Sequence, residues 1–160
     1  MQKEYISIAH AAFSTAQAVP NSVHISSFTR GIYALLSPAP TFWRVVGITR
    51  TALSILLDNL DAKRLPKGLQ RAHICQRADT IKTLLNGPTL SLEEFERAVL
   101  GEADYTILCA KGENNNQLAS RNDIIRIKNI GDDPLFQPHG FAARWSELEK
   151  NCVRNLSSKH

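Results

Sequence analysis

The sequence predicts an α+β fold in a single domain that spans residues 1–160. Apolar residues recur at spacings of three and four over most of residues 2–60, which is typical of amphipathic helices. Two short runs, 69–75 and 105–110, instead have the length and composition of strands, and the residues between them show helical spacing again. With 43% hydrophobic and 21% charged residues, the chain has the composition of a globular domain.

The first 68 residues are expected to form a helical front that ends in a basic loop. The spacing of apolar residues predicts a helix over 2–18, ending before a proline. A second short helix is predicted from Ser26 or Ser27 to Leu36, with a proline-containing turn after it. The apolar stripe that follows Thr41 is weakened by a glycine and by β-branched residues, so its second half, 51–60, is the clearer helix.

A helical insertion is expected between the two predicted strands. After the strand 69–75, the spacing predicts a short helix over 79–85. Ser91 and Glu94 then match a capping box, which is the clearest helix start in the chain. Gly101 stands where a left-handed C-terminal cap would end that helix.

The second strand, 105–110, leads through a Lys-Gly turn to a predicted polar helix over 113–120. Residues 124–130 predict a further strand, and 141–153 a final amphipathic helix. These elements divide the domain into a helical front, a central core and a C-terminal part, at residues 1–68, 69–130 and 131–160.

The basic excess of the chain is concentrated in one segment. The formal net charge is +4, and residues 41–71 carry six Lys or Arg against two Asp. Four of these cations surround a loop that contains Pro and Gly: Lys63, Arg64, Lys67 and Arg71. Such a cluster suits a polyanion, since Lys and Arg displace the counterions condensed on phosphate groups. A solvated basic loop is the alternative interpretation.

Apolar stretches and cysteines indicate the cellular compartment of the protein and the state of its thiols. The longest apolar runs fall far short of the roughly 20 residues that span a bilayer, so we expect no membrane segment. The N-terminus has no uninterrupted apolar region of the kind found in secretion signals, and we expect a cytoplasmic protein. Three widely spaced cysteines argue against a disulfide framework or a four-cysteine zinc site, and we expect buried thiols.

Residues able to carry chemistry lie on and after the two strands that flank the insertion. His73 is in the first strand, and Glu113 and Asn114 follow the second. Phosphodiester hydrolysis needs a base that activates water and a divalent cation that neutralises developing charge. A histidine can be the base, while carboxylate and amide oxygens are ligands that Mg²⁺ prefers. Taken singly, a histidine on a strand or a run of asparagines is more often structural.

The segments Ala72-His73-Ile74 and Ile107-Leu108-Cys109, followed by Glu113-Asn114, resemble the HNH, or ββα-metal, endonucleases. The resemblance implies a core of two strands and a helix, wrapped here by additional helices. It matches His73 to the general base and Asn114 to a metal ligand, with Glu113 as the alternative ligand. The position before the histidine, usually an acidic residue or histidine that binds the metal, is Ala72 in this chain.

The function implied by this resemblance is hydrolysis of double-stranded DNA by a site-specific endonuclease of the restriction type, with Mg²⁺ as the expected cofactor. An enzyme of this size is expected to act as a homodimer on a twofold-symmetric target. Five cations are expected to contact the DNA backbone: Lys63, Arg64, Lys67, Arg71 and Arg77.

Two alternatives remain open. Gly31-Ile32-Tyr33 with Val45 to Thr49 resembles the paired strands of the GIY-YIG nucleases, although the second tyrosine is missing and Tyr33 also suits a core position. A noncatalytic nucleic-acid-binding or interaction module is the alternative from another class. In that case only the basic segment 63–71 would contact the ligand.

Overall fold

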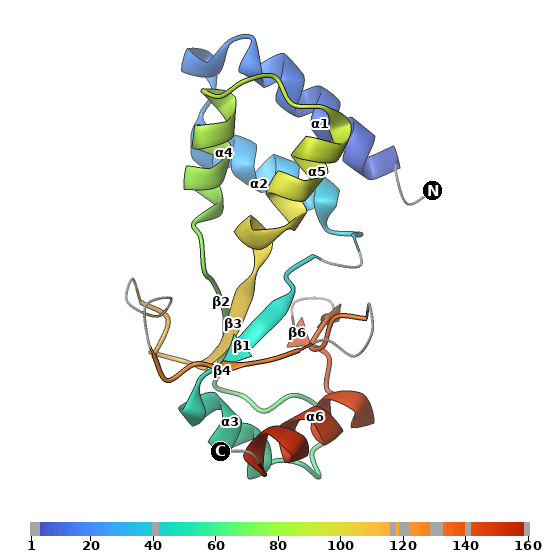
Figure 1. The fold of residues 1–160 in the computed structure, drawn as a ribbon, viewed down its shortest axis with the longest axis vertical. Helices are drawn as coiled ribbons and strands as arrows, with labels where there is room; N and C mark the ends of the chain where they lie inside the picture. The colour runs from blue at the N-terminus through green and yellow to red at the C-terminus, as the bar shows by residue number, and fades with distance from the viewer. Residues whose placement is uncertain are drawn as a thin grey trace. The chain divides into compact units, whose positions relative to one another are not determined.

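Helices and strands are mixed along the chain in the computed structural model of the protein (Figure 1). The structure describes residues 4–39, 42–115, 118, 122–128, 133–139 and 142–158. The predicted α+β class is confirmed. The chain, predicted as one domain, divides into two compact units. We call them the helical unit, Met1–Phe42 with Cys75–Asp104, and the sheet unit, Trp43–Ile74 with Tyr105–His160. No helix among the described residues is both long and apolar enough to cross a membrane.

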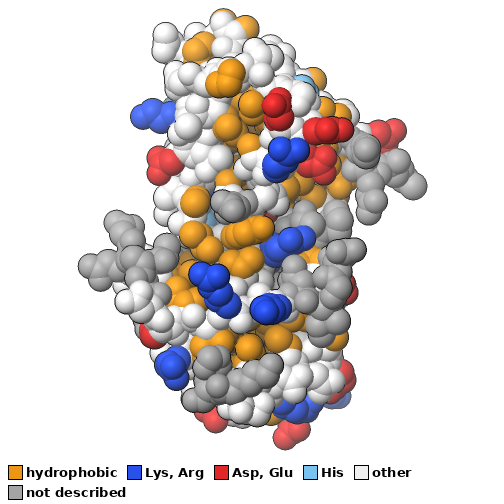
Figure 2. Space-filling model, viewed as in Figure 1, with side chains coloured by type: hydrophobic (Ala, Val, Ile, Leu, Met, Phe, Trp, Pro, Cys, Tyr) orange, Lys and Arg blue, Asp and Glu red, His pale blue; other side chains and the backbone are white. Residues whose placement is uncertain are grey.

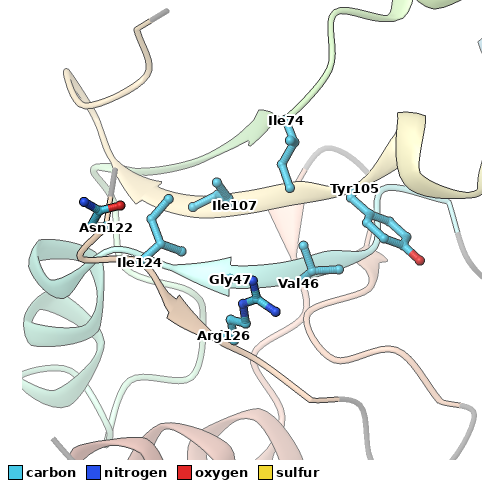
Figure 3. A pocket seen from close by; sticks show the side chains of 8 residues that line it. All are labelled: Val46, Gly47, Ile74, Tyr105, Ile107, Asn122, Ile124 and Arg126. Atoms are coloured by element: carbon cyan, nitrogen blue, oxygen red, sulfur yellow. The ribbon is translucent and has the colours of Figure 1, made fainter. Parts of the chain in front are cut away.

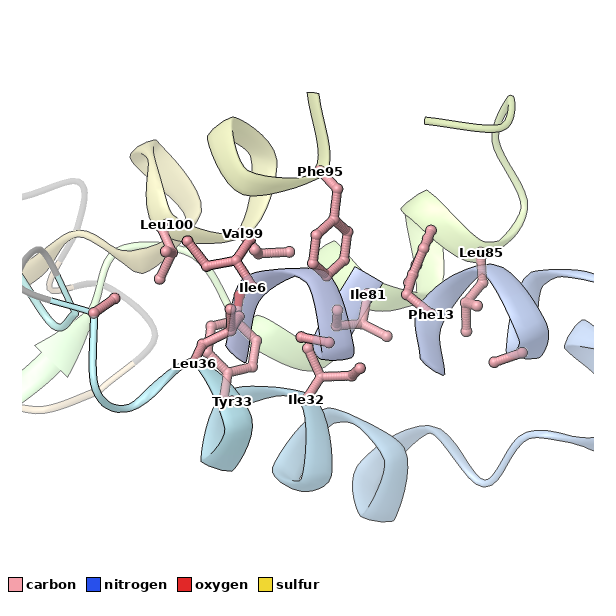
Figure 4. Packing of buried hydrophobic residues seen from close by; sticks show 13 residues of the cluster. Ile6, Phe13, Ile32, Tyr33, Leu36, Ile81, Leu85, Phe95, Val99 and Leu100 are labelled. Atoms are coloured by element: carbon pink, nitrogen blue, oxygen red, sulfur yellow. The ribbon is translucent and has the colours of Figure 1, made fainter. Parts of the chain in front are cut away.

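The helical unit consists of four α-helices with two short 3₁₀ turns among its described residues. The helices are α1 (Glu4–Gln17), α2 (Ile25–Leu36), α4 (Arg77–Leu85) and α5 (Leu92–Leu100), and the turns are η1 (Pro20–Ser22) and η2 (Glu102–Asp104). All four helices were predicted: α1 and α2 from apolar spacing, α4 as a short helix over 79–85, and α5 from its capping box. Their buried faces meet in one core, in which the rings of Phe13 and Phe95 lie 5.1 Å apart (Figure 4).

The two ends of α5 illustrate a confirmed and a wrong prediction. The capping box is present, because Glu94 Oε2 accepts from the Ser91 amide at 2.8 Å and Ser91 Oγ accepts from the Glu94 amide at 3.3 Å. These hydrogen bonds lower the pKa of Glu94. The left-handed cap is wrong, since Gly101 has a φ of −87°. Glycine is required there for a different reason, because a Cβ would lie 2.2 Å from the Arg97 carbonyl oxygen.

The sheet unit is built on a four-stranded sheet in the order β2-β3-β1-β4. Its elements are β1 (Val45–Ile48), α3 (Arg50–Leu57), β2 (Leu69–His73), β3 (Thr106–Ala110), β4 (Ile125–Arg126), β5 (Pro138–His139), β6 (Ala142–Ala143) and α6 (Glu147–Ser157). Strand β3 is central, antiparallel to β2 and parallel to β1, and β4 is antiparallel to β1. Helices α3 and α6 contribute to the apolar core of this unit together with residues of β1 and β3.

Three predicted elements in the sheet unit need correction. The first half of the apolar stripe after Thr41 is strand β1, because β-branched residues favour a strand. Gly47 in this strand allows Ile124 to approach closely, since a Cβ at position 47 would lie only 2.7 Å from Ile124 Cγ2. The helix predicted over 113–120 is absent from the described residues 113–115, which are irregular; 116, 117 and 119–121 lie outside the described residues. The last helix begins at Glu147 rather than near residue 141, because Ser146 and Glu149 form a capping box.

The cysteines differ in exposure. Cys109 is buried on β3, Cys152 is half-buried on α6, and Cys75 is exposed, so the expectation of three buried thiols is wrong for Cys75. All three cysteines are free thiols, as the sequence predicted when it argued against a disulfide framework.

A buried ion pair in the helical unit joins the two ends of the insertion. Arg77 begins α4, and its Nε donates to Asp104 Oδ1 at 3.0 Å, with a second contact from Nη2. The Asp104 side chain is 0% exposed and that of Arg77 is 15% exposed. The guanidinium also lies 3.9 Å from the ring centre of Tyr33 and 4.7 Å from that of Phe42. Burial lowers the pKa of Arg77, and Asp104 opposes this change.

We expect Asp104→Asn to lower the free energy of unfolding by about 3 kcal/mol or more, because it leaves the buried Arg77 charge without its carboxylate. Urea unfolding followed by circular dichroism measures this loss. Lys82→Ala, which removes an exposed cation from the same helix, should change stability by less than about 0.5 kcal/mol. An Asp104→Asn protein as stable as the wild type would show that the pair is not needed for folding.

Candidate functional site

His73 is the last residue of β2, where it pairs with Thr106 of β3. Its ring meets the Trp43 ring edge-on, with 5.1 Å between ring centres. The Arg71 guanidinium, on the same face of β2, lies 4.3 Å from the centre of the Trp43 ring. The Trp43 backbone has a φ of 58°, a left-handed conformation that costs on the order of 1–3 kcal/mol for such a residue. Trp43 therefore holds the histidine and the arginine in one cluster at this end of the sheet.

Glu113 has a different position, at the other end of β3. Its Oε2 accepts from Thr49 Oγ1 at 2.6 Å and from the Ala110 amide at 2.9 Å, and its Oε1 accepts from Thr51 Oγ1 at 3.0 Å. Thr49 is also the N-cap of α3, where Oγ1 accepts from the Ala52 amide at 3.2 Å. Glu113 thus fastens the turn after β3 to the first turn of α3, which is a structural role.

The strand register separates the predicted base from the predicted metal ligands. His73 pairs with Thr106, while Ala110, which precedes Glu113 and Asn114, pairs with Leu69. Four residues of strand correspond to about 13 Å, so the two groups follow opposite ends of the β2–β3 pair. Asn114 is exposed and irregular rather than helical.

The donor set therefore does not fit one metal ion shared with His73. Within the part of the chain that the structure describes, no three His, Cys, Asp or Glu side chains come together as a metal site. The carboxylate of Asp104, two residues before β3, is buried against Arg77 in the helical unit.

The five cations predicted to bind DNA fall into three environments. Lys63, Arg64 and Lys67 are exposed on the loop before β2, as expected for a basic surface. Arg71 is half-buried on the Trp43 ring. Arg77 is committed to the buried ion pair in the helical unit, so its position gives it a structural role. The face drawn in Figure 2 shows Lys and Arg side chains singly or in small groups among hydrophobic ones.

The residues of the GIY-YIG resemblance do not form paired strands. Gly31, Ile32 and Tyr33 lie within helix α2, whereas Val45 begins strand β1. Tyr33 is a core residue, and burial raises the pKa of its hydroxyl. The expectation that Tyr33 lies on a strand is therefore wrong, because an amphipathic helix buries it instead.

A cavity of about 510 Å³ lies over the central strands of the sheet unit (Figure 3). Its apolar lining comes from Val46, Ile74, Ile107 and Ile124, while its polar lining includes Tyr105, Asn122 and Arg126. Tyr105 and Asn122 lie toward opposite ends of this cavity in Figure 3. His73 is not among the residues that line it.

A second cavity, of about 580 Å³, lies between the basic loop and the start of α6. It is lined by Lys63, Arg64, Leu65, Ala143, Arg144, Trp145 and Ser146. Among these residues are three cations and no carboxylate. Arg144 was not among the residues predicted from the sequence. The pattern Ser-x-x-Glu at 146–149, a capping-box signal, marks the start of α6 beside it.

Arg144 is oriented by Glu149, whose side chain is fully buried. Arg144 Nε donates to Glu149 Oε1 at 3.1 Å, and the Phe136 amide donates to the same oxygen at 3.2 Å. Glu149 Oε2 accepts from the amide of Ser146 at 3.1 Å and also from its hydroxyl. Burial raises the pKa of Glu149, but the hydrogen bonds from Ser146 and Arg144 outweigh it, so the pKa is lowered overall.

We expect Glu113→Gln to lower the free energy of unfolding by about 1–2 kcal/mol in the absence of any metal, because a charged acceptor of three hydrogen bonds is lost. Chemical unfolding with EDTA present measures this change. Asn114→Ala, at an exposed neighbouring position, should be nearly neutral. If Glu113→Gln were as stable as the wild type, the structural role assigned to Glu113 would be contradicted.

We also expect the protein to lose stability in acid through Glu149. Its folded pKa is lowered, so its contribution is fully present above the unfolded pKa of about 4.3 and is lost as the pH falls through the folded pKa. Thermal unfolding of the wild type and Glu149→Gln between pH 7 and pH 3 tests this. The stability difference should shrink as the pH falls, and a difference independent of pH would contradict the account.

Comparisons with known proteins do not assign the chain to a family. The chain matches no protein-family model, and neither the curated proteins nor the solved structures contain a match. Assignment of a function therefore rests on the residues and contacts of this chain.

Proposed function

We propose that the protein is a DNA endonuclease in which His73 acts as the general base. The observation that carries this proposal is the antiparallel pairing of β2 with β3. These strands lie far apart in the sequence, and the segment between them contains α4 and α5. An HNH-like core requires this strand pair, with the histidine on the first strand and the second strand leading to further ligands.

In this proposal the sheet unit contacts the DNA. Exposed Lys63, Arg64 and Lys67 bind backbone phosphates, and their loop leads directly into the strand that ends at His73. His73 takes the proton from the water that attacks the phosphorus atom. Restriction-type cleavage of a twofold-symmetric target by a homodimer is the corresponding expectation for the assembly.

Mg²⁺ is the cofactor that the resemblance implies, where it would neutralise charge on the phosphate and the leaving oxygen. The positions of Glu113 and Asn114 do not fit an ion shared with His73. The proposed mechanism therefore contains no metal-dependent step, and the cleavage assay measures whether a divalent cation is required.

The second candidate is a noncatalytic nucleic-acid-binding module that uses the 63–71 segment. It is favoured by the contacts of Glu113, whose two carboxylate oxygens accept hydrogen bonds from Thr49, Thr51 and the Ala110 amide. In this case His73 is a structural partner of Trp43, and the basic loop alone contacts the phosphates.

Incubation with supercoiled plasmid and with longer linear DNA distinguishes these candidates. We expect discrete fragments from the wild type and none from His73→Ala, because the base that activates water is lost. Parallel reactions with Mg²⁺, with Mn²⁺ and with EDTA measure whether cleavage requires a divalent cation. His24→Ala, which removes an exposed histidine from the helical unit, is the matched control and should cleave normally.

DNA binding by each variant is measured in parallel, so that loss of cleavage is separated from loss of folding. His73→Ala protein that binds DNA with wild-type affinity but does not cleave it supports the endonuclease. Intact DNA under every condition, together with salt-sensitive binding by the wild type, would overturn it in favour of the binding module.

A further inference from the structure

We infer that the cavity lined by Lys63, Arg64 and Arg144 is a phosphate-binding pocket for the nucleic-acid backbone. This inference rests on the proposed nucleic-acid substrate and assigns its backbone to one place in the sheet unit. It adds Arg144 and the β6–α6 junction to the contact surface predicted from the sequence, which comprised the 63–71 loop and Arg77.

The charges around the cavity favour an anion. The described residues of its lining include three cations and no carboxylate. Among the described residues, neither Lys63 nor Arg64 takes part in an ion pair, so their charges are available to a ligand. Glu147, the exposed carboxylate at the start of α6, is paired with Lys150 at 2.9 Å.

Arg144 differs from the two loop cations because its guanidinium is fixed. Its Nε bonds to the buried Glu149, and its Nη2 lies 3.8 Å from Asp133 Oδ2. The side chain is still 33% exposed, and the residue lines the cavity. A planar guanidinium that is held in place loses little freedom when its remaining N–H groups donate to a phosphate oxygen.

The composition of the walls indicates which part of a nucleic acid the cavity receives. Leu65, Ala143 and Trp145 are apolar, and the Ser146 hydroxyl already donates to Glu149. The remaining polar groups are cations, which donate to the charged oxygens of phosphates. Contacts of this kind position the duplex without selecting a sequence.

The first experiment measures the binding of a fluorescently labelled 20-base-pair duplex at several salt concentrations. For the double variant Lys63→Ala with Arg64→Ala, the slope of log affinity against log salt should fall by about 2, roughly one for each phosphate contact. The fall should be the same for duplexes of unrelated sequence. The charge-matched control, Arg30→Ala with Lys82→Ala on exposed faces of the helical unit, should keep the wild-type slope.

The second experiment tests Arg144 in the wild-type protein. Phenylglyoxal modification followed by mass spectrometry should show that the duplex protects Arg64 and Arg144, while exposed Arg97 of the helical unit reacts equally with and without DNA. Protection of Arg64 without Arg144 would overturn the pocket and leave a loop contact alone.

The outcomes separate this inference from the endonuclease proposal. An unchanged salt slope in the double variant overturns the pocket even if plasmid is cleaved. Binding with the expected slopes and with protection of Arg144, but without cleavage, supports the pocket and overturns the endonuclease. Absence of duplex binding by the wild type overturns both.

Discussion

The buried ion pair between Arg77 and Asp104 is the constraint on which the chain path depends. The chain leaves β2 at His73 and returns to β3 at Thr106, and the pair joins residues just inside these two points. Two charges removed from water are stabilising only when they remain together, and here the guanidinium is also covered by Tyr33 and Phe42. The pair therefore joins the start of α4 to η2 and closes the segment that contains α4 and α5.

This register has a direct consequence for function. One end of the β2–β3 pair carries His73 with Trp43 and Arg71, and the other end continues to Glu113. Glu113 is held by Thr49 at the end of the parallel strand β1, so it stabilises the start of α3. Among the described residues, His73 therefore lies with Trp43 and Arg71 rather than with Glu113, and the basic loop leads into the same strand. Phosphate binding and proton transfer can thus be tested independently in the sheet unit.

Much of the fold could be predicted from the sequence because its signals are local. The Ser91 capping box, the apolar spacing of α1 and the strand composition at 69–75 and 105–110 all gave elements that the structure contains. Val45 to Ile48 was ambiguous, because its β-branched residues continue a helical apolar stripe and only the neighbouring strand β3 decides between the two.

The candidate site was harder to predict, because it depends on contacts between distant residues. Glu113 looked like a ligand at a helix start, but its partners are Thr49 and Thr51, more than 60 positions away. Arg77 looked like a surface cation until its burial against Asp104 was known. Arg144 was not selected because a single arginine carries no signal. It becomes a candidate once Glu149 orients it and the cavity places it with Lys63 and Arg64.

The most direct test of the account asks whether DNA reaches His73. Nuclear magnetic resonance of protein with ¹³C-labelled histidine rings follows all five histidines at once, and variants at His73 and His24 assign their signals. On addition of a duplex with Ca²⁺ in place of Mg²⁺, the His73 ring signals should shift while those of His24 in the helical unit do not. Duplex binding that leaves the His73 signals unchanged would contradict the assignment of this residue to the site.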